Sequence, residues 1–193
     1  MASLTWNSNG WRALPTEMDL KDSHHKYVRS FKKSNDAFNF GHPNAQLVDV
    51  DGYYWGFVPA LFSKSINSKK SEKIKIILFH SKSTKAKRQY MVGIYLSPLF
   101  FRTIDNILIP SVLSNVKVLP KNIISTHIPL LDLDIARLLP EGKELANQGF
   151  NVIDEQNILY ILNYIKETDC TDINSDKINI WISENIQDNN IKS

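Results

Sequence analysis

Hydrophobic residues follow a strand pattern over the middle of the chain. Three short stretches, at 53–58, 73–80 and 90–96, are rich in β-branched and aromatic residues and are separated by Ser, Lys and Asn turns. The second stretch begins with alternating polar and apolar residues and then becomes continuously apolar, which is typical of a strand that enters a core from an exposed end. The pattern predicts three antiparallel strands.

The stretches around these strands have weaker patterns. Residues 1–50 contain turn-forming residues throughout, so we expect loops with short strands at 3–6 and 46–50. Helical spacing of Tyr27, Val28 and Phe31 predicts a short helix within 23–33, with a mobile basic loop as the alternative. Pro110 interrupts the apolar stretch 100–118, which predicts an edge strand or two short pieces.

The last third of the chain favours helices. Residues 130–139 are compatible with one or two helical turns, ended by Pro140. Asp154 is a suitable N-cap for a helix whose apolar side carries Ile158, Leu162 and Ile165. Residues 172–193 predict a weak helix or strand with a frayed end.

Length and composition point to a globular protein. A chain of 193 residues with 42% apolar and 22% charged residues suits one domain of ordinary size, with a helical appendix at most. Neither a run of 18 apolar residues nor a signal-peptide pattern is present, so we expect a cytoplasmic protein that does not enter a membrane. The single Cys170 cannot form an internal disulfide.

Charge divides the chain into two parts. Residues 1–123 contain 18 Lys and Arg against 8 Asp and Glu, whereas residues 124–193 contain 5 against 12. We therefore expect a basic β-rich domain over 1–123 and an acidic helical extension over 124–193 that packs on it. A basic body suggests a polyanionic partner, most often nucleic acid. A solvated lysine-rich surface is the alternative.

Aromatic residues concentrate between two glycines at 51–59, Asp-Gly-Tyr-Tyr-Trp-Gly-Phe-Val-Pro. Successive strand residues point to opposite faces, so Tyr53, Tyr54 and Trp55 cannot all enter one core. Further aromatic and amide side chains occur upstream, in Trp-Asn-Ser-Asn-Gly-Trp at 6–11 and Asn-Phe-Gly-His at 39–42. Together they predict a pocket for a flat, hydrogen-bonding ligand such as a base.

Two strands and several short motifs resemble a known fold. Ile-Ile-Leu-Phe-His-Ser at 76–81 and Met-Val-Gly-Ile-Tyr at 91–95 resemble the middle of the EVE and YTH branch of the PUA-like fold. The N-terminal motifs resemble an amino-terminal domain of bacterial modification-dependent restriction enzymes, over about residues 4–100. One position departs, because Glu72-Lys73 stands where EVE domains usually have a Gly-Asp turn.

The resemblance implies an α+β, PUA-like fold: a curved β-barrel or sheet with flanking helices and a C-terminal helical segment. It also implies that a modified or flipped base is held in an aromatic cage, with Trp6, Trp11 and Trp55 as cage candidates and His80 and Ser81 near the rim. We add side chains whose amides, rings or imidazole could contact a base edge. The full expected base-binding set is Trp6, Asn7, Asn9, Trp11, Asn39, His42, Tyr53, Trp55, His80 and Ser81.

Phosphate contacts are expected from two basic stretches. The hairpin tip at 81–88 has four cations and no acidic residue, and the stretch 23–33 is also basic. The expected phosphate-binding set is Lys82, Lys85, Lys87, Arg88, Lys32 and Lys33. Adjacent His24 and His25 have no further ligand at zinc spacing, so we expect no metal site.

No catalytic motif is recognisable. The sequence has no Ser-His-Asp motif, no phosphate-binding glycine loop and no HNH or paired-carboxylate nuclease pattern, and none of its motifs calls for a cofactor. We expect a non-catalytic reader of modified double-stranded DNA, with any nuclease activity in a partner or fused domain. An RNA-binding PUA-like module, or a protein-interaction and assembly module, remains the alternative.

Overall fold

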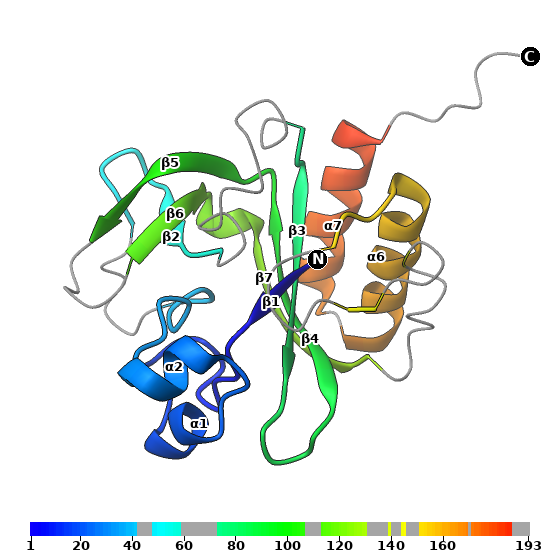
Figure 1. Cartoon of the computed structure of the whole chain (residues 1–193). Coiled ribbons are helices and arrows are strands. Elements are labelled where there is room, and N and C mark those ends of the chain that lie inside the picture. The colour runs from blue at the N-terminus through cyan, green and yellow to red at the C-terminus, as the bar shows by residue number, and fades with distance from the viewer. Residues whose placement is uncertain are drawn as a thin grey trace, which may run out of the picture.

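The computed structural model describes residues 1–41, 48–58, 73–106, 113–130, 139, 144–145, 151–169 and 171–186. Within these residues the chain is α+β, with two sheets and flanking helices (Figure 1). This confirms the expected class at the level of a sheet with flanking helices. The expected strand at 46–50, the helical turns at 130–139 and His42 fall wholly or largely outside the described residues.

The main sheet has the strand order β1-β3-β4-β7. Its strands are β1 (Ala2–Leu4), β3 (Ile76–Lys82), β4 (Gln89–Leu96) and β7 (Ile123–Pro129). β3 and β4 form the hairpin that the sequence predicts, while β1 pairs with β3 in parallel. Since β7 starts at residue 123, the main sheet continues across the predicted boundary between the basic and acidic parts.

The second sheet has the order β2-β6-β5 and is antiparallel. It contains β2 (Tyr54–Gly56), β5 (Leu99–Asn106) and β6 (Leu113–Val118). The apolar stretch at 100–118 therefore forms two strands, one of the predicted alternatives. The prediction of three neighbouring antiparallel strands is wrong in one part, because β2 pairs with β6 instead of β3. The chain leaves the main sheet after β4, and this change of sheet depends on tertiary packing that local pattern does not encode.

The main sheet separates two hydrophobic clusters. Phe79 and Tyr95 on one face pack with residues of the second sheet and the N-terminal segment, including Phe40. Leu78 and Ile94, their neighbours in the strands, belong to the opposite cluster together with residues of the C-terminal helices. This alternation follows from the two-residue period of a strand.

Two glycines allow rings to pack against the strands. An added Cβ at Gly93 would overlap the Phe40 ring and lie 2.8 Å from the Ile124 carbonyl oxygen. A Cβ at Gly56 would overlap the phenol of Tyr95. Larger side chains at these two positions would therefore push the aromatic core off the sheet.

The C-terminal helices cover the other face of the main sheet (Figure 1). They are α6 (Glu155–Asp169) and α7 (Asp172–Asn185). Asp154 caps α6 as predicted, since its Oδ1 accepts the Asn157 backbone N–H at 2.8 Å. The Ile165 and Trp181 side chains are buried in the cluster beneath. Residues 172–185 are thus helical, which agrees with one of the predicted alternatives.

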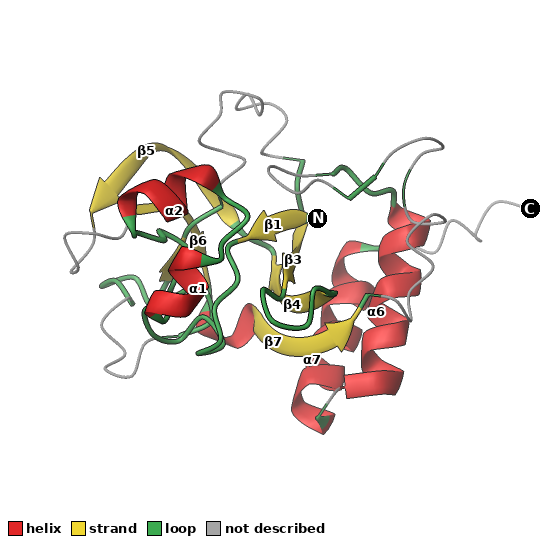
Figure 2. Ribbon diagram, turned by 60° about the horizontal axis from the view of Figure 1, so that its bottom comes forward, coloured by secondary structure: helices red, strands yellow, loops and turns green. Residues whose placement is uncertain are grey.

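Two short helices lie near the N-terminus, on the side of the second sheet (Figure 2). α1 (Glu17–Lys21) begins with a capping box between Thr16 and Asp19. α2 (Lys26–Phe31) confirms the short helix expected within 23–33, and it ends at Lys32 in a left-handed conformation. His24, just before α2, lies within electrostatic reach of Arg29 of α2 and of Lys82 and Lys87 of the β3–β4 hairpin.

Candidate nucleic-acid interface

Trp11 is a core residue. Its side chain is 2% exposed, its Nε1–H donates to the Thr5 carbonyl at 3.0 Å, and its ring packs against Phe40. The Phe40 amide also donates to the Trp11 carbonyl at 3.1 Å. The structure therefore places Trp11 in the packing of the N-terminal segment and not at an open cage wall.

Two asparagines of the expected base-binding set hold backbone. Asn7 is 2% exposed, and its amide group donates to the carbonyls of Ala13 and Ala37. Asn39 is 1% exposed, and its side-chain amide makes two hydrogen bonds with the backbone of Phe57. Its Nδ2 donates to the Phe57 carbonyl, and its Oδ1 accepts the Phe57 backbone N–H. Both amides are buried and bonded, so their visible role is structural.

Asn9 is the one exposed amide of this group. Its Nδ2 donates to the Leu14 carbonyl at 2.6 Å, and its backbone N–H donates to Asn7 Oδ1. These bonds shape the turn between Trp6 and Trp11. The Asn9 side chain lies at the surface with one side already bonded.

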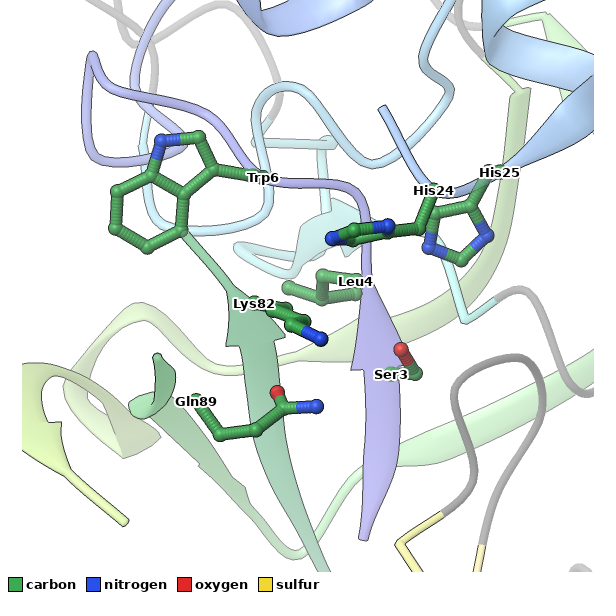
Figure 3. Close-up of a pocket in the computed structure, with 7 residues that line it drawn as sticks. All are labelled: Ser3, Leu4, Trp6, His24, His25, Lys82 and Gln89. Atoms are coloured by element: carbon green, nitrogen blue, oxygen red, sulfur yellow. The ribbon is translucent and has the colours of Figure 1, made fainter. Parts of the chain in front are cut away.

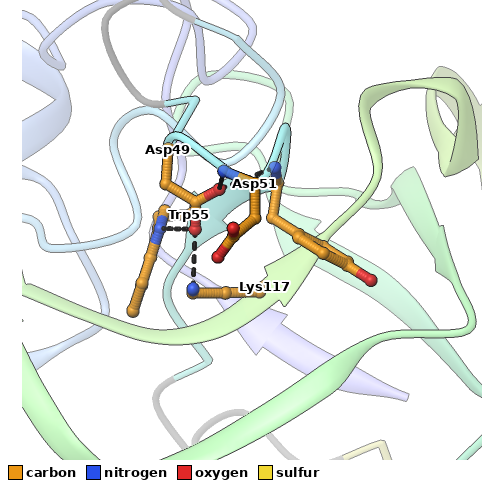
Figure 4. A network of polar contacts seen from close by, with 5 residues as sticks. Asp49, Asp51, Trp55 and Lys117 are labelled. Atoms are coloured by element: carbon orange, nitrogen blue, oxygen red, sulfur yellow. Dashed lines mark hydrogen bonds and ion pairs between the residues drawn. The ribbon is translucent and has the colours of Figure 1, made fainter.

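Trp55 belongs to a polar network with Asp49 and Lys117, shown in Figure 4. Asp49 Oδ2 accepts the Trp55 indole N–H at 2.9 Å and pairs with Lys117 Nζ at 2.6 Å. Lys117 Nζ also lies 4.3 Å from the centre of the Trp55 ring. Asp49 Oδ1 accepts the Tyr53 backbone N–H, and the Tyr53 ring lies 5.9 Å from the same Nζ. We call these four residues the Asp49 network.

Charge is balanced inside the Asp49 network. The ion pair with Lys117 lowers the pKa of Asp49 from its usual 3.8 to about 2. The carboxylate is therefore ionised at neutral pH and neutralises the lysine beside the ring. A ligand stacking on the Trp55 face that Lys117 covers would have to displace this cation.

Trp6 has a different environment, at the end of β1. Its half-buried ring packs edge-on against Trp11 at 5.8 Å and contacts Tyr90 at 5.7 Å and His127 at 5.9 Å. Tyr90 and the exposed His127 are stacked at 4.4 Å. We call Trp6, Tyr90 and His127 the Trp6 platform, because they bring three ring systems together at the surface.

A pocket adjoins the Trp6 platform (Figure 3). It is lined by Ser3, Leu4, Trp6, His24, His25, Lys82 and Gln89. In Figure 3 the Lys82 ammonium, the Gln89 amide and the His24 ring point into the same space in front of β1 and β3. None of the lining residues is acidic, so the pocket favours an anion or a hydrogen-bonding ligand.

Cations from two separate segments converge at this pocket. His24 is exposed, and its pKa is lowered by partial desolvation and then by the positive charges of Lys82, Lys87, His25 and Arg29. The first two belong to the β3–β4 hairpin and the last two to the segment around α2. We call His24, His25, Arg29, Lys82 and Lys87 the cation cluster. Residues of the two basic stretches that the sequence suggests thus lie close together around His24.

The remaining expected phosphate contacts are exposed. Lys85 and Arg88 lie in the hairpin turn, which is closed by a hydrogen bond from the Ser83 amide to the Arg88 carbonyl at 2.8 Å. Lys32 and Lys33 follow α2 and are also exposed.

His80 and Ser81 are fully buried behind the pocket. Ser81 Oγ donates to the Leu4 carbonyl at 2.9 Å and ties β3 to β1. Burial lowers the pKa of His80 to about 4, so its imidazole is neutral at neutral pH. The Gln89 side chain lies beside the His80 ring and interacts with it, but among the described residues neither ring nitrogen of His80 nor Gln89 Oε1 makes a hydrogen bond of standard geometry.

Sequence reasoning missed Tyr90, His127 and Gln89. Tyr90 and Gln89 are in a predicted strand or next to it, but their positions give no signal of which face is open. His127 comes from the acidic part of the chain, which the charge division assigns to a support. Only the β4–β7 pairing, with Tyr90 opposite Pro129, brings it beside the Trp6 ring.

No protein-family model, no curated protein and no solved structure matches this chain. Over the described residues, no helix has the length and apolar character needed to cross a bilayer. The same residues include no group of three or more potential metal ligands.

Proposed function

We propose that the chain is a non-catalytic nucleic-acid-binding module that stacks a base on the Trp6 platform and binds adjacent phosphates through the cation cluster. One observation carries the proposal: Trp6, Lys82 and His24, from three separate segments, line the same pocket. An aromatic ring beside unneutralised cations suits a polymer of flat bases and anionic linkages. Lys82 pairs with no carboxylate within the described part of the chain.

Double-stranded DNA with a modified base is the proposed ligand, and this choice rests on the resemblance in sequence. Extruding a base costs a few kcal/mol, and stacking on an aromatic side chain contributes about 1 to 3 kcal/mol per base. The Trp6 platform can therefore offset much of that cost. Trp11 is buried, and Lys117 lies over the Trp55 ring. We therefore propose that the base stacks on the Trp6 platform alone and not in a cage of three tryptophans.

The ligand class is tested with a panel of oligonucleotides. Duplexes contain 5-methylcytosine, 5-hydroxymethylcytosine, its glucosylated form, N6-methyladenine or no modification, and RNA counterparts have the same sequence. We expect one modified duplex to bind more tightly than the plain duplex. Tighter binding of RNA would favour an RNA-binding module, and absence of binding to every member would favour the protein-interaction alternative.

A matched pair of variants tests the cation cluster. Lys82→Ser with Lys87→Ser should weaken binding to all sequences and lower the salt slope by about 2, since each phosphate contact contributes about 0.9. Lys73→Ser with Lys75→Ser removes the same charge near the other end of β3, roughly 23 Å from Lys82 at about 3.3 Å per residue. We expect little effect there. Equal losses in both variants would mean that net charge, and not this site, determines binding.

A further inference from the structure

The pocket beside Trp6 contains more polar groups than its own contacts satisfy. Lys82 and His24 point into it from opposite segments, with the Gln89 amide on the third side (Figure 3). Gln89 Oε1 is buried and has no hydrogen-bond partner among the described residues. In Figure 3 the Gln89 amide nitrogen lies on the side of the open space, so its NH₂ group can donate to a bound oxygen.

His80 is buried next to Gln89, and the two side chains interact with each other. Within the described residues neither ring nitrogen of His80 makes a hydrogen bond of standard geometry. Buried polar groups are nearly always hydrogen-bonded in proteins, so this weakly bonded pair beside an opening suits a polar ligand. A lysine, an imidazole and an amide donor around one space favour an anion with several oxygens.

We infer that a single phosphate group of the bound nucleic acid lies at the mouth of this pocket and places one oxygen in it, and that His24 takes up a proton when the phosphate binds. The inference rests on the proposed function for the identity of the polymer. It adds a defined phosphate subsite next to the stacked base and makes binding dependent on pH. Phosphate contacts elsewhere on the basic surface need no proton.

The physical reason is the charge around His24. Burial and the cations Lys82, Lys87, His25 and Arg29 all lower the pKa of His24 in the free protein. A phosphate between these groups offsets the repulsion, so the charged imidazole becomes more favourable in the complex. By linkage, affinity then rises as pH falls, over the range between the free and the bound pKa of His24.

Other titratable groups near the pocket behave differently. His25 interacts electrostatically with His80 and with the buried carboxyl of Asp36. The Asp36 carboxyl accepts hydrogen bonds from the Thr5 backbone N–H and from the Ser34 hydroxyl. Burial raises the pKa of Asp36, whereas the pKa of His80 is lowered to about 4. His80 thus stays neutral above pH 5.5 and does not contribute to a change in affinity between pH 5.5 and 8.

The test uses a thymidine oligonucleotide without terminal phosphates, because neither its bases nor its diesters titrate between pH 5.5 and 8. Affinity is measured at both pH values, and the His24 ring is titrated by NMR with and without the oligonucleotide. We expect tighter binding at pH 5.5 and a higher His24 pKa in the complex. A rise of one pKa unit corresponds to at most about a tenfold change in affinity.

Two variants separate the pocket from other histidines. His24→Gln should remove most of the pH dependence while salt-sensitive binding persists. His127→Gln removes an exposed imidazole outside the pocket, and it should keep the pH dependence even where affinity falls. Equal affinity at both pH values, or unchanged pH dependence in His24→Gln, would overturn the inference while leaving the proposed function in place.

Inorganic phosphate supplies the opposite control. It should shift the NMR signals of His24 and Gln89 in the wild-type protein and do so less in Lys82→Ser. If phosphate binds there but no oligonucleotide binds at all, the pocket is an anion site and the proposed function fails. If oligonucleotide binds and phosphate perturbs only residues outside the pocket, the subsite assignment fails.

Discussion

Two half-buried tryptophans in this molecule have a lysine nearby, and among the described residues only one of these lysines pairs with a carboxylate. At Trp55, Asp49 bonds both the indole and Lys117, and Lys117 covers the ring. At Trp6, Lys82 lines the same pocket and pairs with no carboxylate within the described residues. Both sites thus combine a tryptophan with a lysine, and they differ in the Asp49 carboxylate, which is present only at Trp55.

The difference separates a structural aromatic site from a candidate binding site. In the Asp49 network every strong donor near the ring has an acceptor, so the contacts stabilise the turn before β2. In the pocket beside the Trp6 platform, desolvation and then the nearby positive charges lower the pKa of His24. An external anion would offset these positive charges. Aromatic density alone, which is high at both sites, does not distinguish them.

The largest loss of stability is expected for truncation of Trp11, whose side chain is buried in the core. Trp11→Ala should lower the free energy of unfolding by about 3 to 5 kcal/mol, as is typical when a buried aromatic side chain is truncated. Trp6→Ala should cost clearly less because its ring is half-buried. Denaturant unfolding measures both. Equal losses would place Trp6 in the core and remove the platform.

The folded protein should also lose stability in mild acid, because His80 is buried in its neutral form. The folded-state pKa of His80 is about 4 against an ordinary 6.5, so the unfolded chain takes up this proton first. Stability is full above pH 6.5 and falls as pH approaches 4, by about 3 kcal/mol at 1.36 kcal/mol per unit. His80→Phe should flatten the stability curve in this window. A wild-type curve that matches the variant's would contradict the buried, neutral imidazole.

Base stacking gives the next effect. Trp6→Leu should weaken binding of the preferred oligonucleotide by about 1 to 3 kcal/mol, the usual value for loss of one aromatic contact. Trp55→Leu is the matched control, since it removes a half-buried indole from the second sheet. Its affinity should stay near wild type although its melting temperature falls. The reverse pattern would move the base site to the Asp49 network.

The smallest effect is expected from the Asp49 carboxylate. Its folded-state pKa is about 2, below the ordinary 3.8, so its stabilising contribution is present above about pH 4 and is lost as pH falls through 2. Asp49→Asn should therefore remove a loss of stability between pH 4 and 2 and leave oligonucleotide affinity unchanged. Thermal unfolding across this range, with binding measured at pH 7, checks both. Weakened binding in Asp49→Asn would argue that the Asp49 network contacts the ligand.

Local signals predict a large part of the fold. Asp154 is an N-cap because a short acidic side chain precedes an amphipathic run, and that geometry needs no tertiary contact. The β3–β4 hairpin follows in the same way from two apolar stretches around a polar turn. The parallel pairing of β1 with β3 and the transfer of β2 to the second sheet involve distant segments. Their partners depend on packing that periodicity does not contain.

The candidate site likewise has features that the local sequence predicts and features that depend on tertiary packing. Exposure of Lys85, Lys87 and Arg88 is predictable because a charged hairpin tip stays in water. The sequence does not predict which of the two rings, Trp6 or Trp11, is exposed. That depends on how the turn between them directs each ring. Trp11 has φ 56°, an unusual backbone conformation for a tryptophan, and its ring turns inward onto Phe40.

The four indole N–H signals of the protein test the central claim in one NMR titration. In the free protein, Trp11 donates to Thr5, Trp55 to Asp49 and Trp181 to Ser97, so three indoles are held by internal acceptors. Addition of the preferred oligonucleotide should shift the Trp6 signal most and leave those of Trp55 and Trp181 nearly unchanged. A large shift at Trp55 with none at Trp6 would contradict the assignment of the Trp6 platform as the base-binding surface.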